Sequence, residues 1–193
     1  REVISIEELK EWYQKLLDEY HKWLSYQKKW KEERNHSLQS LEFPFSYREG
    51  QRKMVSSVYH TIGASRQIFI QAPTGVGKTM STIFPAVRAV GEGKGETIFY
   101  LTAKTITRTV AQEAFEVLRE KGMKYKVVTI TAKEKLCFMD ETKCDPVHCP
   151  YARGHFDRVN DAVYELWTMK SRYDRETIRE QAEKWQVCPF EMC

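Results

Sequence analysis

An eight-residue segment in the first half of the chain has the composition of a phosphate-binding loop. Residues 72–79 read Ala-Pro-Thr-Gly-Val-Gly-Lys-Thr, follow an apolar run and precede an expected helix. This strand-turn-helix context separates a Walker A loop from a chance match, although alanine takes the place of the first glycine. The two glycines let successive backbone N–H groups turn towards phosphate oxygens, and the helix N-terminus adds its dipole.

Each residue of this loop is predicted to contact ATP or its metal ion. Lys78 places a cation beside the β- and γ-phosphates, and Thr79 offers its hydroxyl to Mg²⁺, so these two are the candidate catalytic residues. The predicted cofactors are therefore ATP and Mg²⁺. The other ATP-binding residues of the loop are Thr74, Gly75, Val76 and Gly77.

A glutamine upstream of the loop is a candidate adenine reader. Gln51 ends the sequence Tyr-Arg-Glu-Gly-Gln, about twenty residues before the first expected strand. A glutamine amide can accept from N6 and donate to N7 of adenine. A glutamine on a surface helix would carry no such meaning, but its distance from the phosphate loop favours recognition. We include Arg48 and Gln51 in the predicted ATP site.

The cysteines form a second candidate site. None lies in the first 136 residues, and the set is Cys137, Cys144, Cys149, Cys188 and Cys193. An odd number at one end argues against a secreted disulfide framework and for a local ligand set in a reducing, cytoplasmic compartment. The spacing, x6, x4 and then x38, lacks the two close pairs of a structural zinc site. Four thiolates in a loop-rich segment suit a [4Fe–4S] cluster better. Zinc, with His148 as one ligand, and unligated thiols remain alternatives.

The elements that must position these residues alternate between strand and helix. Strands are predicted at 67–71, 97–101 and 126–130, with helices at 78–90 and 105–121 between them. This order predicts an α/β fold, a P-loop parallel sheet covered by helices on both faces. Another helix is expected before the first strand, with Met54, Val55 and Val58 on one face.

The two ends of the chain are predicted to be helical. Residues 5–33 begin with the capping box Ser-Ile-Glu-Glu and carry an apolar stripe, which indicates one long helix. It packs on its own domain or on a neighbour, or it self-associates as a coiled coil. Residues 133–190 read as a small helical insertion around the cysteines. The predicted domains are 1–42, an N-terminal helix and linker; 43–132, the P-loop domain; and 133–193, the cysteine domain.

The charge distribution favours a phosphate-rich partner for the middle of the chain. Residues 43–132 hold thirteen basic and six acidic side chains, a net +7, against +4 for all 193 residues. The longest uncharged stretch, residues 54–65, is half polar and too short to span a bilayer. The chain begins at Arg1 without a methionine, which suggests that it is cut from something longer.

Several of these motifs together resemble superfamily-two helicases. They are Phe-Pro-Phe before Arg48-x-x-Gln51, the phosphate loop and Tyr-Leu-Thr-Ala-Lys-Thr at 100–105. Cysteines after the third expected strand, ending in Cys-Pro-Phe-Glu at 188–191, are similar to those of iron–sulfur DNA helicases of the XPD/DinG family. This resemblance covers about residues 43–193. It implies a first RecA-like motor lobe interrupted by an iron–sulfur domain, and ATP-driven 5′-to-3′ unwinding of DNA.

The resemblance also implies site residues and partners. Its ligand set is Cys137, Cys144, Cys149 and Cys188, which leaves Cys193 spare. Its backbone contacts to single-stranded or forked DNA fall on Thr102, Lys104, Thr105 and Thr107. The family's Asp-Glu-x-His box is not found at Asp140-Glu141, because Lys143 replaces the histidine. The second motor lobe is also missing, and a nuclease domain precedes the helicase in some bacterial relatives. We therefore expect an N-terminal part of a motor that binds nucleotide and hydrolyses it poorly.

Two other functions compete with this interpretation. A small P-loop transferase or kinase with a zinc site would need an acceptor pocket within these residues, and no acidic cluster for one is evident. A non-catalytic nucleic-acid-binding module would use the cysteine domain as a wedge.

Overall fold

A computed structural model describes residues 3–103 and 105–193. The chain divides into two compact units. Unit 1 comprises Arg1–Tyr26 and Lys126–Cys193, and unit 2 comprises Gln27–Tyr125. The long helix α1, Ile6–Gln39, contributes residues to both units. The predicted N-terminal helix is thus confirmed, and it extends six residues beyond the expected end.

The start of α1 is fixed by the expected capping box. The Ser5 N–H donates to Glu8 Oε2 at 2.7 Å, and the Glu8 N–H donates to Ser5 Oγ at 3.2 Å. These reciprocal bonds satisfy backbone donors that a helix N-terminus leaves unpaired, and they lower the pKa of Glu8. In unit 1 the helix contacts Tyr164 through Lys22, whose Nζ lies 4.2 Å from the centre of the Tyr164 ring, and through Trp23, whose ring meets Tyr164 edge-on at 4.9 Å. Earlier apolar side chains such as Ile6 are exposed.

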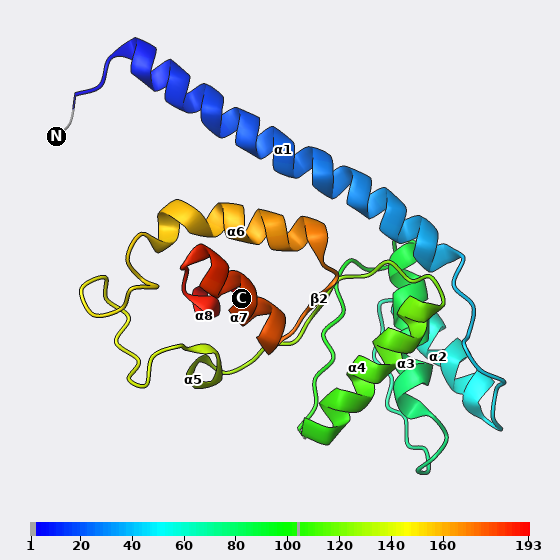
Figure 1. The fold of residues 1–193 in the computed structure, drawn as a ribbon. Helices are drawn as coiled ribbons and strands as arrows, with labels where there is room; N and C mark the ends of the chain where they lie inside the picture. The colour runs from blue at the N-terminus through cyan, green and yellow to red at the C-terminus, as the bar shows by residue number, and fades with distance from the viewer. Residues whose placement is uncertain (1–2, 104) are drawn as a thin grey trace. The chain divides into compact units, whose positions relative to one another are not determined.

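Unit 2 is built from the end of α1 and three further helices. These are α2, Gln51–Gly63; α3, Lys78–Gly91; and α4, Thr105–Glu120. Figure 1 shows them side by side, with α3 in contact with both α2 and α4. The end of α1 approaches α3 so closely that a Cβ on Gly91 would come within 2.5 Å of Leu38 Cβ. The fully buried side chains of this core include Leu38, Ile83, Val87 and Leu118.

Two predicted strands are not formed in unit 2. Residues 67–71 and 97–101 contain no strand, so the expected three-stranded sheet is not formed in this structure. A parallel strand is stable only when its backbone pairs with a neighbour and helices cover its faces. Here the helices bury one another, while Phe69 is 95% exposed and Leu101 is 88% exposed. The described residues are therefore mostly helical.

The sheet that does form in the described residues belongs to unit 1. It joins β1, Val127–Val128, in parallel to β2, Arg172–Tyr173. Val127 is in register with Arg172, and the Thr129 N–H extends the ladder by donating to the Tyr173 carbonyl at 2.8 Å. The third predicted strand thus shrinks to two residues and pairs with a segment that we expected to lie between helices.

The other regular elements of unit 1 are helices. Its elements after β1 are α5, Lys133–Leu136; α6, His155–Met169; α7, Arg175–Trp185; and α8, Pro189–Met192. Figure 1 shows α6, α7 and α8 gathered together, in line with their contacts. Asp174 caps α7 by accepting from the Thr177 N–H at 3.0 Å. The core side chains are Leu136, Ala162, Leu166, Tyr173, Ile178, Ala182, Val187 and Met192.

This apolar core should hold unit 1 together. We expect Ile178→Ala to lower the free energy of unfolding by about 2–5 kcal/mol, because it empties a buried volume between helices. Ile178 is 2% exposed. The same change at Ile6, which is 66% exposed, should alter it by less than about 0.5 kcal/mol. Urea unfolding monitored by circular dichroism compares the two, and equal effects would contradict this assignment of the core.

Candidate phosphate-binding loop and cysteine segments

The phosphate loop turns directly into the N-terminus of α3. Gly77 precedes the helix in the left-handed conformation, with φ 81°, and Gly75 has φ 85°. L-residues with side chains rarely adopt these angles, so both positions require glycine. The first backbone N–H groups of α3 have no intrahelical acceptors and face the loop as donors. This geometry suits an anion at the loop.

Lys78 lies folded back on this loop. Its Nζ donates to the carbonyl oxygens of Ala72 at 2.9 Å and Pro73 at 2.8 Å. The side chain is exposed, whereas Thr79 beside it is half-buried. A phosphate group arriving at the loop would offer the ammonium a charged acceptor in place of two neutral carbonyls.

Arg48 and Gln51, predicted from their position upstream, both reach the phosphate loop. Arg48 Nη1 donates to the Gly75 carbonyl. Gln51 is 4% exposed, and its Oε1 accepts from the Arg48 N–H at 3.0 Å. Its amide nitrogen lies so close to Gly77 that a Cβ there would come within 2.5 Å of it. The two residues thus support the loop from α2 and the segment before it.

The predicted DNA contacts are described only in part. Lys104 lies outside the described residues, and nothing is described of the Thr105 side chain. Thr102 is exposed in the segment before α4, and Thr107 is half-buried in the first turn of α4. In the phosphate loop, Thr74 is exposed and Val76 is half-buried.

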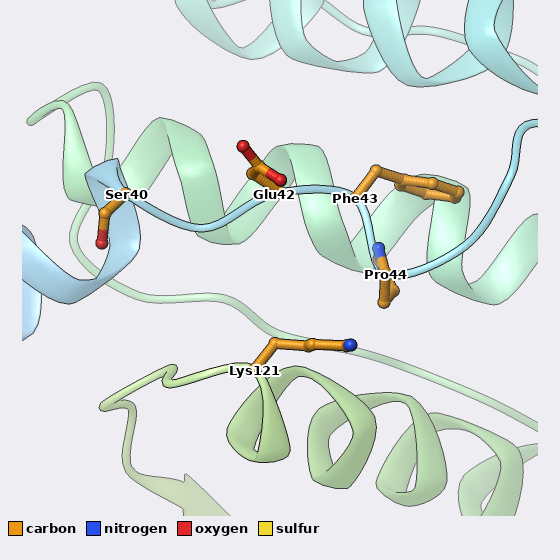
Figure 2. Close-up of a pocket in the computed structure, with 5 residues that line it drawn as sticks. All are labelled: Ser40, Glu42, Phe43, Pro44 and Lys121. Carbon is orange, nitrogen blue, oxygen red and sulfur yellow. The ribbon is translucent and has the colours of Figure 1, made fainter.

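A small polar pocket lies elsewhere in unit 2. Its volume is about 260 Å³, and none of its lining residues was predicted as a site residue. Figure 2 shows four of them along the segment that follows α1, with Lys121 on the opposite side. The lining residues are Ser40, Glu42, Phe43, Pro44 and Lys121. We assign this pocket no role.

All five cysteines belong to unit 1. Cys137 follows α5, and Cys188 is the residue that caps α8. Both are half-buried, Cys149 is buried, and Cys144 and Cys193 are exposed. Within the described residues, no three His, Cys, Asp or Glu side chains lie close enough together to hold one metal ion. The four predicted ligands therefore share a unit but do not form an assembled site.

A lysine lies near two of the predicted ligands. A hydrogen bond to Cys144 is the main reason why the pKa of Lys133 is raised, and the charges of Glu191 and Cys188 act in the same direction. Lys133 thus lies near thiols that are 44 residues apart in the chain. Partial desolvation raises the pKa of the Cys193 thiol, which disfavours its thiolate form.

Sequence reasoning missed the side chains that hold the cysteine segments. His155 Nδ1 accepts from the Cys188 N–H, and Arg179 donates to the Cys137 carbonyl. No sequence signal distinguishes either residue from an ordinary helix residue, because each acts on a segment more than thirty residues away.

No helix among residues 3–103 and 105–193 combines the length and apolar character needed to cross a bilayer.

Comparison with known proteins identifies the family. The sequence profile of the DEAD/DEAH box helicases matches residues 48–150, more than half of the chain. The chain therefore belongs to the DEAD/DEAH box helicase family, whose helicase domain implies an ATP hydrolase. It is also 29% identical over 123 residues to a probable ATP-dependent helicase of Methanocaldococcus jannaschii. That match covers 62% of this chain and 18% of the relative. No solved structure matches.

Proposed function

We propose that this chain supplies the ATP-binding segments of the first motor lobe of a 5′-to-3′ DNA helicase of the iron–sulfur type. The observation that carries the nucleotide part is the loop ahead of α3, whose glycines are contacted by Arg48 and Gln51. The membership of the DEAD/DEAH box family supports ATP as the ligand. The iron–sulfur type, the polarity and the DNA substrate are proposals that rest on the sequence resemblance.

In this proposal the loop and α3 bind the phosphates. The backbone N–H groups of residues 75–79 donate to phosphate oxygens, and Lys78 exchanges its two carbonyl acceptors for the β- and γ-phosphates. Thr79 binds Mg²⁺ through its hydroxyl. Hydrolysis further needs a carboxylate pair, which the exposed Asp140 and Glu141 do not suit, since Glu141 is paired with Lys143 at 2.8 Å. We therefore expect ATP binding with little turnover.

A RecA-like parallel sheet is part of the proposal. Residues 67–71 and 97–101 carry the exposed apolar side chains Phe69, Phe99 and Leu101. Strands added beside them would pair their backbones and bury these side chains. The backbone of single-stranded DNA would then be contacted by Thr102, Lys104, Thr105 and Thr107. Residues 43–132 carry a net charge of +7, which attracts the negatively charged phosphates of this backbone.

We further propose that Cys137, Cys144, Cys149 and Cys188 bind one [4Fe–4S] cluster. The donors fit in chemistry, because soft thiolates are the ligands of such clusters, and all four lie in unit 1. In this structure the four thiols do not form a closed site, because no three of them lie close enough together to hold one metal ion. When bound, the cluster would cross-link the four segments and stiffen unit 1.

The adenine site can be tested by nucleotide preference. We expect the chain to bind ATP more tightly than GTP. Gln51→Ala should reduce the ratio of the two affinities about tenfold, because it removes one bidentate contact to the base. Titration with fluorescent ATP and GTP analogues measures both affinities. Gln67→Ala is the control, since Gln67 is an exposed glutamine of the same unit. A preference unaffected by Gln51→Ala would reject adenine recognition, and equal wild-type affinities would favour a nucleotide site of another class.

A further inference from the structure

The N-terminal turn of α6 holds the segment that carries Cys188. His155, the first residue of α6, is 5% exposed, and its Nδ1 accepts from the Cys188 N–H at 3.1 Å. One turn later, Arg158 Nε donates to the Trp185 carbonyl at 2.9 Å, and its Nη2 donates to the Gln186 carbonyl at 2.6 Å. These bonds attach the segment between α7 and α8 to α6.

A second side chain does the same for Cys137. Arg179 lies in the middle of α7, and its Nη1 donates to the carbonyl oxygens of Leu136 at 2.8 Å and Cys137 at 3.0 Å. Its guanidinium group stands 4.3 Å from the centre of the Phe138 ring. The segment is thereby fixed on both sides of Cys137, and Leu136 is fully buried beside it.

The two contacts share a geometry that suits a supporting role. Each joins a side chain of a packed helix to the backbone of a cysteine that caps or follows a short helix. On the cysteine side these bonds use backbone atoms only, so they leave both thiols available to bind metal. Cys144 differs, because it is exposed in a loop and its described contact is with the side chain of Lys133.

We propose that His155 and Arg179 are positioning residues of the cysteine site, an inference that rests on the proposed metal function. They hold the backbones of Cys188 and Cys137 in place, and the loop bearing Cys144 and Cys149 completes the ligand set. Residues that orient ligands from behind commonly change metal retention when replaced, although they never touch the metal. The apolar core of unit 1 packs both helices, so this support rests on side chains outside the ligand set.

The test is iron retention in the full 193-residue chain. Wild-type, His155→Ala and Arg179→Gln proteins are loaded with iron and sulfide without oxygen and exposed to a chelator. We expect each variant to lose iron about tenfold faster than the wild type. His155→Asn should restore slow loss, because the asparagine Oδ1 can accept the same hydrogen bond as Nδ1. The electron paramagnetic resonance spectrum of the reduced cluster should change in His155→Ala and return in His155→Asn.

Two controls separate positioning from general damage. Arg175→Gln removes the same charge from an exposed site one turn earlier on α7 and should retain iron like the wild type. In metal-free protein, the Cys188 amide should exchange faster in His155→Ala while the helical circular dichroism is unchanged. Iron uptake with equal retention in wild type and His155→Ala would overturn this inference alone. A wild-type chain that takes up no iron would overturn the proposed metal site together with it.

Discussion

Replacing Lys78 by alanine is expected to weaken the binding of Mg-ATP by at least about 100-fold. The ammonium group makes charge-assisted hydrogen bonds to phosphate, each of which contributes more than a neutral bond, and the variant loses all of them. In the free protein the same group donates to two loop carbonyls that remain accessible to water after the change. The loss should therefore appear in ATP affinity and not in stability. Isothermal titration and thermal unfolding measure the two quantities.

Lys53→Ala is the matched control for this prediction. Lys53 is an exposed lysine on α2 in the same unit, outside the phosphate loop. It changes the net charge by the same amount, so any general electrostatic attraction of ATP is lost equally in both variants. We expect Lys53→Ala to bind ATP within about twofold of the wild type, because one exposed charge is strongly screened. If Lys78→Ala bound ATP as well as Lys53→Ala does, the loop would not be the nucleotide site.

Replacing Cys188 by serine is expected to remove most of the iron from anaerobically prepared protein. A serine hydroxyl is a poor substitute for thiolate in an iron–sulfur cluster, and only four candidate ligands are proposed. Cys188 lies at the start of α8, which packs on α7, so its loss as a ligand detaches one end of the proposed cross-link. Iron and sulfide analysis, with absorbance near about 400 nm, measures occupancy. Mg-ATP binding through Lys78 should be preserved.

Cys193→Ser provides the control within the same short segment. Cys193 is an exposed cysteine whose pKa is raised by its surroundings, and it lies outside the proposed ligand set. Its replacement should leave iron content unchanged. Protein that holds one zinc per chain and no chromophore would reject the cluster and favour the zinc alternative. Equal iron loss in both variants would instead show that the ligand set has been assigned wrongly.

The sequence alone determined most of the helices, because their signals are local. The Ser5–Glu8 capping box acts within one turn of the backbone and can be recognised from the residues alone. The start of α3 at Lys78 was also predictable, because the sequence shows two loop glycines followed by an apolar stripe. Both glycines have positive φ in the structure. Family membership followed from the same loop and the motifs around it, and the profile match supports it.

Only the tertiary structure decided what depends on distant partners. Residues 67–71 and 97–101 have the composition of strands but form none in the described residues, because composition does not provide the neighbouring backbone that a strand requires. The pairing of Val127 with Arg172 joins segments 45 residues apart. The burial of Gln51 against Gly77 and the reach of His155 and Arg179 to cysteine backbones are likewise nonlocal. Such contacts depend on how whole helices pack, and that packing is a property of the assembled cores and not of any single segment.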